Sequence, residues 1–263
     1  MTALALQSAA LTDCGRVRDH NEDSWLVSAD RRLLVVADGM GGHNAGEVAA
    51  GLCVDALEDL FQPPAGPRPW WRFWGPGLQG RARLRDALQR ANRLIFDTSR
   101  TQAAYQGMGT TAVALWLDGP MLHHAHVGDS RLYRCRAGEL AQLTRDHSLL
   151  DRFQQAGLVD AEGARQFPYK NVVMRALGLQ PTTQVDTASI EGQVGDRFLL
   201  CSDGLTDLVD AKTILASLAA DLPLKDIARS LVNAALEAGG ADNVTVVVAQ
   251  LELESAPPAR TPG

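Results

Sequence analysis

The sequence predicts an α+β domain in which antiparallel β-sheets are layered with helices on their outer faces. Two early strand-rich segments are followed by two helices, a long run of short strands, two further helices and a final strand. Because these elements do not alternate as β-α-β units, antiparallel sheets are expected rather than a parallel one. Between residues 110 and 144 the strands are separated only by Asp-Gly, Gly-Asp and Ala-Gly pairs, which indicates an antiparallel meander.

The composition is that of a globular protein and argues against several function classes. The chain has 263 residues, of which 46% are hydrophobic and 21% charged, with a net charge of −6. That acidic balance argues against non-specific binding to nucleic acid, and no apolar run reaches the ~18 residues that a membrane span needs. The N-terminus lacks the basic start of a secretory signal. Four scattered cysteines favour reduced thiols and a cytoplasmic location.

The first half of the chain predicts three strands and two helices. The strands are expected at residues 6–13, 24–29 and 32–37, and the helices at about 45–61 and 81–99. The third strand is an apolar run that ends at Asp38 and continues into a glycine-rich turn, where other backbone can approach this carboxylate closely. Asn44 and Glu47 then resemble a capping box at the start of the first helix.

Residues 62–77, QPPAGPRPWWRFWGPG, separate the two helices and concentrate proline and tryptophan. Proline and glycine at this density rule out regular structure. Trp70, Trp71 and Trp74 either pack over the edge of the core or form an exposed recognition loop, since aromatic residues are favoured at interfaces.

The second half predicts the meander, a less regular segment at 146–180, and a helical C-terminal part. The strands are expected at 110–117, 121–128, 131–136, 139–144, 183–190, 196–201 and 244–253, and the helices at about 147–156, 204–219 and 223–238. His124 and His126 share one face of a strand and are interpreted as structural. Residues 255–263 are expected to form a disordered tail.

Four aspartates share a local pattern: Asp38 in A-D-G, Asp129 in G-D-S, Asp203 in S-D-G and Asp242 in A-D-N. Three follow apolar strands and the fourth precedes one, so they can meet at one edge of a sheet. Any one of them alone could be an ordinary turn residue. Clustered carboxylates repel one another unless a cation neutralises them, and all-oxygen ligands favour Mg²⁺ or Mn²⁺. A pair of such ions suits attack on phosphorus, with Arg18 as the candidate guanidinium for the phosphate.

Six ordered motifs then carry a family resemblance. They are R-x-x-x-E-D at Arg18–Asp23, V-A-D-G-M-G-G-H at 36–43, G-T-T at 109–111, H-V-G-D-S-R at 126–131, L-L-C-S-D-G-L at 199–205 and D-N-V-T at 242–245. Together they resemble the metal-dependent protein phosphatases of type 2C in their compact bacterial form. The resemblance covers roughly residues 6–251, nearly the whole chain.

The resemblance implies a β-sandwich flanked by helix pairs, with the metal centre at one edge, and a single catalytic domain over residues 1–254. It implies two Mn²⁺ or Mg²⁺ ions, with a third in bacterial relatives. The implied ligands are Asp38, the Gly39 carbonyl, Asp129, Asp203, Asp242 and, through water, Glu22. Asp38 would bridge the two ions, and Asp129 would hold the third together with Asp203.

The resemblance further implies that Arg18 binds the substrate phosphate and that water or hydroxide bridging the ions attacks phosphorus directly, without a phosphoenzyme. One departure concerns the proton for the leaving group, since Met40 stands where many eukaryotic relatives have a histidine. His43 is a candidate contact for substrate or leaving group, and the alternative is a surface residue at a helix start. A metal-bound water could also supply the proton. Residues 146–180 correspond to the flap segment that shapes substrate access in bacterial relatives.

The function expected from this resemblance is hydrolysis of phosphoserine and phosphothreonine in proteins by a cytoplasmic, monomeric signalling enzyme. An opposing bacterial Ser/Thr kinase is the expected partner. The alternative is a catalytically silent relative that binds phosphoproteins as a scaffold, and retention of the four aspartates and Arg18 argues against it. A two-metal phosphodiesterase acting on nucleic acid is disfavoured by the net charge of −6.

Overall fold

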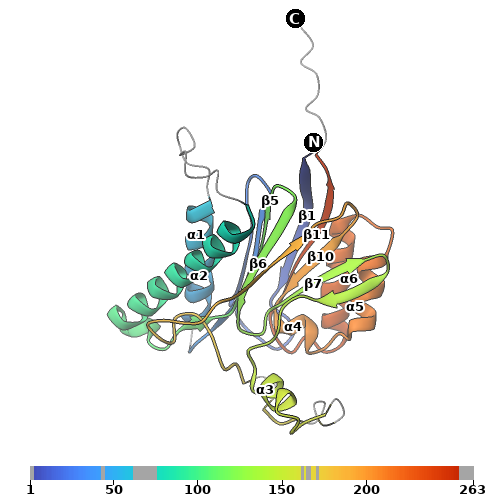
Figure 1. Ribbon diagram of the computed structural model, residues 1–263. Helices are drawn as coiled ribbons and strands as arrows, with labels where there is room; N and C mark the ends of the chain where they lie inside the picture. Colours follow the sequence, from blue (N-terminus) through green and yellow to red (C-terminus); the bar gives the residue numbers. More distant parts are fainter. Residues whose placement is uncertain are drawn as a thin grey trace, which may run out of the picture.

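Two antiparallel β-sheets stacked face to face form the centre of the structure, and helices cover both outer faces (Figure 1). The computed structural model describes residues 3–42, 45–61, 76–160, 163, 167–169 and 172–254. Every pairing between the described strands is antiparallel. The predicted α+β fold of an antiparallel sandwich flanked by helix pairs is therefore confirmed.

The strands of the two sheets are far apart in sequence. The first sheet has the order β1-β11-β10-β7-β8 and consists of β1 (Leu4–Asp13), β7 (Arg131–Arg136), β8 (Glu139–Gln142), β10 (Arg197–Cys201) and β11 (Val244–Leu253). The second has the order β2-β3-β5-β6-β9 and consists of β2 (Asp23–Val27), β3 (Leu33–Met40), β5 (Ala112–Asp118), β6 (Met121–Val127) and β9 (Asp186–Glu191). A short strand, β4 (Gly109–Thr110), pairs with the end of β3.

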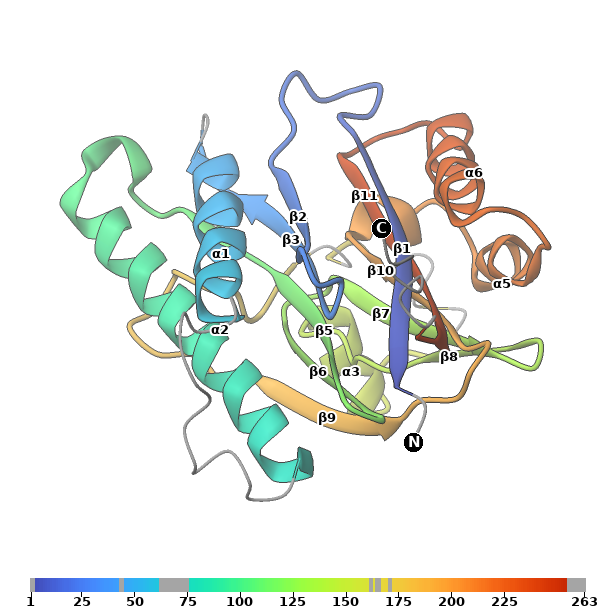
Figure 2. The same ribbon diagram turned by 90° about the horizontal axis from the view of Figure 1, so that it is seen from above.

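Helices form the two outer layers, as the view from above shows (Figure 2). Helices α1 (Ala45–Phe61) and α2 (Pro76–Thr101) cover the second sheet, and α5 (Ala211–Ala219) and α6 (Leu224–Glu237) cover the first. Shorter helical segments are η2 (Ala103–Tyr105), α3 (Leu149–Gln155) and α4 (Asp203–Thr206). No described helix is long and apolar enough to cross a membrane.

Strand β3 shows how the sandwich positions its functional edge. Leu33, Val35 and Ala37 pack against α1 and α2, whereas Leu34 and Val36 point between the two sheets. Because successive side chains of a strand face opposite sides and both sides are buried here, the strand needs an unbroken apolar run. Its end is therefore rigidly held.

One predicted helix was wrong. Residues 204–219 form two helices, α4 and α5, with a break at 207–210. Asp210 causes the second start, because its side chain accepts a hydrogen bond from the Thr213 N–H at 2.8 Å and so caps α5. Helical periodicity runs through the break, which is why the pattern predicts one helix.

Several sequence-based predictions fall outside the described residues. These are His43, most of the proline- and tryptophan-rich segment at 62–77 with Trp70, Trp71 and Trp74, and the tail at 255–263. In the flap segment, α3 begins after Ser148, whose hydroxyl accepts a hydrogen bond from the Asp151 N–H at 3.2 Å. The predicted helix at 147–156 is thus present and slightly shorter.

Candidate metal centre

Five aspartates come together at one edge of the sandwich, and we call them the acidic cluster: Asp23, Asp38, Asp129, Asp203 and Asp242. Strand pairing puts Asp23 directly opposite Asp38. Asp203 opens α4 immediately after β10, and Asp129 lies in the turn between β6 and β7. Asp242 lies two residues before β11, the strand that pairs with β10. The elements that hold the cluster belong to both sheets.

The carboxyl groups of the cluster raise one another's pKa. Burial raises the pKa of Asp38 well above its usual range, and Asp23, Asp203, Asp129 and Asp242 add to the effect in that order. The pKa of Asp203 is raised to about 6, first by burial and then by nearby carboxylates, although Asp203 also shares a hydrogen bond with Asp38. Burial is also the main reason why Asp23 and Asp129 each have a pKa of about 7. The cluster carries more negative charge than its surroundings compensate.

Two carboxylate oxygens at this edge are buried without a hydrogen-bond partner among the described residues. They are Oδ1 of Asp23 and Oε1 of Glu22. The second oxygen of Asp23 accepts a hydrogen bond from the Ser202 hydroxyl at 2.8 Å. Buried oxygens with no hydrogen to accept are costly unless a cation binds them. An all-oxygen donor set of this kind fits a hard divalent cation such as Mg²⁺ or Mn²⁺.

Glycines let Glu22 reach the end of β3. A Cβ on Gly39 would lie 2.1 Å from the Gly46 carbonyl oxygen and 2.5 Å from that of Glu22. A Cβ on Gly46 would lie 2.7 Å from the Glu22 carboxyl carbon. The Gly39 N–H donates to the Glu22 carbonyl at 3.1 Å. The two glycines therefore let the Glu22 carboxyl lie against Gly46 and the Glu22 backbone lie against Gly39, the residue after Asp38.

Arg18 lies at the rim of the cluster with half of its side chain exposed. Its Nη2 donates to Asp242 Oδ2 at 2.8 Å. Hydrogen bonding to Asp242 raises the pKa of the guanidinium, and the charges of Asp242, Glu22 and Asp38 act in the same direction. The predicted phosphate-binding residue thus lies at the site, with one of its donors engaged by a predicted metal ligand.

The backbone around Asp38 is held on both sides. Its carbonyl accepts hydrogen bonds from the Thr111 N–H at 2.8 Å and the Thr110 hydroxyl at 2.9 Å, and its own N–H donates to the Thr111 hydroxyl at 3.1 Å. These contacts explain the G-T-T motif, which positions Asp38. Met40 pairs through its backbone with Gly109, and a thioether cannot supply a proton.

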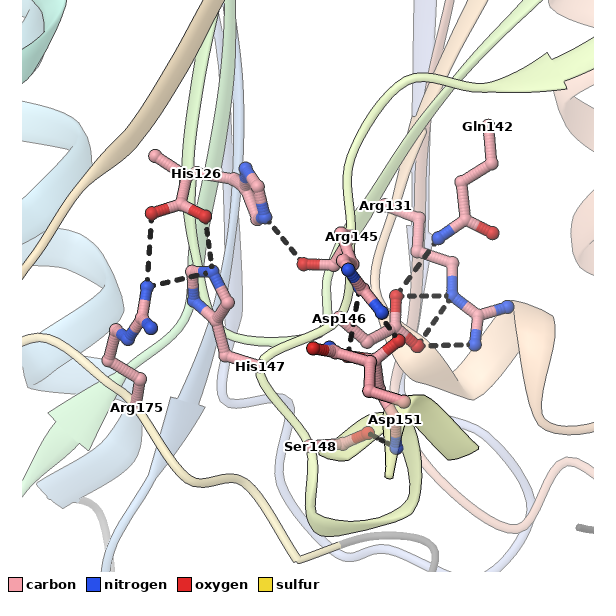
Figure 3. Close-up of polar contacts among 11 residues, drawn as sticks. His126, Arg131, Gln142, Arg145, Asp146, His147, Ser148, Asp151 and Arg175 are labelled. Atoms are coloured by element: carbon pink, nitrogen blue, oxygen red, sulfur yellow. Dashed lines mark hydrogen bonds and ion pairs between the residues drawn. The ribbon is translucent and has the colours of Figure 1, made fainter. Parts of the chain in front are cut away.

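Sequence reasoning missed Asp23 as a site residue. Asp23 follows Glu22 in the R-x-x-x-E-D motif, and adjacent strand residues point to opposite sides. The available signal was the pairing partner, since an acid opposite Asp38 must share its surroundings. The same reasoning did not find Asp146, which binds Arg131 through both carboxylate oxygens at 2.6–3.0 Å beside the cluster (Figure 3).

Comparison with known proteins gives one consistent family. Residues 12–244 match the family described as protein phosphatase 2C. The serine/threonine protein phosphatase PstP of Mycobacterium tuberculosis is 41% identical over 252 residues, which are 94% of this chain and 45% of that protein. This chain therefore spans about half the length of that relative. The serine/threonine phosphatase stp of Listeria monocytogenes is 36% identical, over 92% of this chain and 94% of that protein.

A solved structure extends the likeness to the fold. The catalytic domain of PstP in complex with two manganese ions superposes with a TM-score of 0.81 at 40% identity. The match covers 95% of this chain and 99% of the PstP domain. The similarity therefore includes both sheets, the helices that cover them and the edge that carries the acidic cluster.

Proposed function

Since this chain belongs to the protein phosphatase 2C family, we propose that it is a Mn²⁺- or Mg²⁺-dependent phosphatase acting on phosphoserine and phosphothreonine in proteins. The observation that carries the proposal is the buried acidic cluster, whose pKa values are raised first by burial and then by the charges of neighbouring carboxylates. Relatives named as serine/threonine phosphatases and the manganese-containing PstP structure support it.

In this proposal the cluster holds the cations. Asp38, Asp203, Asp242, Glu22 and the Gly39 carbonyl would hold two ions, with Asp38 as the ligand that both would share. Asp129 and Asp203 would hold a third. When bound, such cations neutralise the carboxylates, activate water for attack on phosphorus and stabilise the charge that develops on the phosphate. Glu22 Oε1 and Asp23 Oδ1, which are buried without a hydrogen-bond partner in the described part of the chain, support a cation at this position.

Arg18 would hold the phosphate of the substrate. A guanidinium presents several N–H donors in one plane and binds phosphate through two of them. One donor engages Asp242 at 2.8 Å, and the half-exposed side chain can turn its other donors to a ligand at the rim. Arg18 therefore links the proposed cation site to the phosphate site through Asp242.

The remaining assignments belong to the same proposal. We place the catalytic domain at residues 1–254, in a monomer that works in the cytoplasm against a Ser/Thr kinase. Four cysteines without disulfides, Cys14, Cys53, Cys135 and Cys201, support a reducing compartment. His43 remains a prediction as a substrate or leaving-group contact.

The test is hydrolysis of a phosphothreonine peptide by the purified chain with Mn²⁺, with excess chelator, and in the variants Asp38→Asn and Asp203→Asn. We expect activity only in the Mn²⁺-loaded wild type and in the control Asp226→Asn, which removes a carboxylate from the surface of α6. Activity that survives chelation and both cluster variants would contradict the proposal. Metal-dependent peptide binding without turnover would identify a phosphoprotein-binding scaffold instead.

A further inference from the structure

A second group of polar side chains lies beside the acidic cluster, and we call it the histidine–arginine network: His126, His147, Arg175 and Asp186. His126 comes from β6 and Asp186 from β9, while His147 and Arg175 come from the two ends of the flap segment. The two imidazole rings stack with their centroids 4.6 Å apart. Figure 3 shows the Arg175 guanidinium beside the His147 ring, and the His126 ring directed at the Arg145 carbonyl.

Three of these residues have the composition of a metal site, since ligand atoms of His126, His147 and Asp186 lie within 4.8 Å of one another. A cation is already present among them. The Nη1 atom of Arg175 lies 3.1 Å from Asp186 Oδ1 and 3.0 Å from His147 Nε2. The guanidinium thus supplies the positive charge that a metal ion would bring.

Hydrogen bonding also decides which nitrogen of His147 carries the proton. The Gly128 N–H donates to His147 Nδ1 at 3.1 Å, so Nδ1 presents a lone pair. The proton therefore lies on Nε2, which donates to Asp186 Oδ2 at 3.2 Å. The 3.0 Å approach of Arg175 Nη1 to Nε2 is then a contact between two donors that both point to Asp186, and not a hydrogen bond. A neutral ring in this state has no lone pair on Nε2 for a metal. Burial is the main cause that lowers the pKa of His147 to about 4, which keeps the ring neutral.

His147 holds both polar groups of the Gly128 backbone. The ring accepts from the Gly128 N–H, and the backbone N–H of His147 donates to the Gly128 carbonyl at 2.9 Å. Gly128 has a φ of +105°, and a Cβ there would lie 2.6 Å from the side chain of Thr111. The next residue along the chain is Asp129, whose buried carboxyl belongs to the acidic cluster. The direction of that carboxyl depends on the conformation of this turn.

The flap segment closes on the same residue. The Met174 N–H donates to the His147 carbonyl at 2.7 Å, and the Leu149 N–H donates to the Val172 carbonyl at 2.9 Å. Arg175 follows Met174 and reaches the His147 ring from outside. The start and the end of the flap segment are therefore joined at His147, the residue that is hydrogen-bonded to Gly128.

We propose that His147 is a positioning residue that holds the Gly128–Asp129 turn, so that the Asp129 carboxylate stays directed at the cation centre. Asp186 and Arg175 orient the His147 ring for this task. Among the described residues, the hydrogen bonds of the His147 side chain join it to Gly128 and Asp186, so it acts on Asp129 through the Gly128 backbone. The inference rests on the proposed function where it concerns cation binding, and on the apoprotein structure where it concerns the turn.

Two variants separate the two nitrogens of the ring. The side-chain oxygen of Asn in His147→Asn can reach the place of Nδ1 and accept from the Gly128 N–H. The longer side chain in His147→Gln reaches the place of Nε2 and leaves Gly128 without its acceptor. Both variants remove the imidazole, so they match each other in lost stacking against His126.

Two readouts are measured. The first is the hydrogen exchange rate of the Gly128 amide in the metal-free protein, and the second is Mn²⁺ affinity by titration calorimetry. We expect His147→Gln to speed Gly128 exchange at least about tenfold and to weaken the weakest Mn²⁺ site about 10- to 100-fold, as the loss of an orienting partner does. His147→Asn should stay within about threefold of wild type in both. Adding Asp129→Asn to His147→Gln should weaken Mn²⁺ binding little further, because the two act on one site.

Equal behaviour of the Asn and Gln variants, or weaker Mn²⁺ binding with unchanged Gly128 exchange, would overturn the proposal. If His147→Gln does not fold, Arg175→Gln releases the ring from outside and should give a smaller loss of the same kind in both readouts. Gly128 exchange is measured without metal or substrate. A wild type without phosphatase activity would therefore refute the proposed function and leave the exchange comparison to decide the role of His147.

Discussion

The acidic cluster and the histidine–arginine network lie side by side at one edge of the sandwich. They differ in whether their carboxylates are paired with arginines. In the network, Asp186 has Arg175 at 3.1 Å, and nearby Asp146 has Arg131 at 2.6 Å. Among the described residues, the basic side chain that forms a salt bridge with the cluster is Arg18, and its partner is Asp242 at the rim. Asp38 and Asp23 lie deeper, where burial first and the charges of neighbouring carboxylates second raise the pKa of both. Arginines neutralise Asp186 and Asp146, whereas the buried acids of the cluster have no such partner among the described residues. The cluster is therefore the place where cations from solution can bind.

The strongest way to break this contrast is to remove the central charge of the cluster. We expect Asp38→Asn to lower phosphatase activity at least about a thousandfold, or about 4 kcal/mol, because cations lose their shared ligand. The same substitution should stabilise the metal-free protein by about 1–2 kcal/mol, since a carboxylate that repels its neighbours is gone. Phosphopeptide kinetics and urea unfolding in chelator measure the two effects. Loss of activity together with loss of metal-free stability would mean that Asp38 is structural.

The pH dependence of the metal-free protein sharpens the contrast. The pKa values of Asp203, at about 6, and of Asp23 and Asp129, at about 7, exceed the ~3.9 of an unfolded aspartate. Between about pH 4 and 7 the folded state then binds more protons than the unfolded state, so its stability falls as pH rises. The slope is about 1.4 kcal/mol per pH unit for each excess proton.

Urea unfolding across that pH range, in chelator, measures this slope. Saturating Mn²⁺ should remove it, and Asp203→Asn should make it shallower. If the stability of the metal-free protein instead rises steadily from about pH 4 to 7, groups of the protein itself neutralise the carboxylates of the cluster.

Removing the Arg131–Asp146 ion pair should lower the stability of the protein more than it lowers cation binding. Asp146→Asn leaves Arg131, which is largely buried, without its two-point partner. We expect a loss of about 2–3 kcal/mol in the free energy of unfolding, below the 3–5 kcal/mol of a fully buried pair. Mn²⁺ affinity should fall by less than in Asp129→Asn. Thermal unfolding compared with calorimetry separates the two effects, and the opposite ranking would place Asp146 among the metal ligands.

The smallest effect is expected from the proline- and tryptophan-rich segment. Deletion of residues 66–76, which lie outside the six motifs in the sequence, should leave hydrolysis of a small aryl phosphate within about twofold of wild type. Binding of a protein partner is the property that this deletion can change. A collapse of the folded state on deletion would favour packing of the tryptophans on the core.

The two regions differ also in how far the sequence predicts them. The acids of the cluster end or begin strands with an apolar pattern, so Asp38, Asp129, Asp203 and Asp242 can be expected at one sheet edge. The structure brings these four aspartates together at that edge, and their roles as metal ligands remain predictions. The antiparallel sheets follow from strand spacing alone, whereas the face-to-face pairing came from the family resemblance.

The histidine–arginine network could not be predicted in the same way. His126, His147 and Asp186 are joined by the pairing of β6 with β9 and by the return of the flap segment, and no local spacing encodes either contact. His126 was interpreted as structural, and the structure adds that it stacks on a ring that grips Gly128. Asp23 was missed because its importance depends on the register that sets it opposite Asp38.

The central claim is that the acidic cluster binds divalent cations from solution. Titration calorimetry of the metal-free chain with Mn²⁺ at about pH 7.5, above the pKa values of about 6 to 7 of Asp23, Asp129 and Asp203, tests it most directly. The account predicts at least two ions bound per chain in the wild type and the loss of at least one in Asp38→Asn, with the surface variant Asp226→Asn unchanged. Equal Mn²⁺ binding by the wild type and Asp38→Asn, or no binding by either, would contradict it.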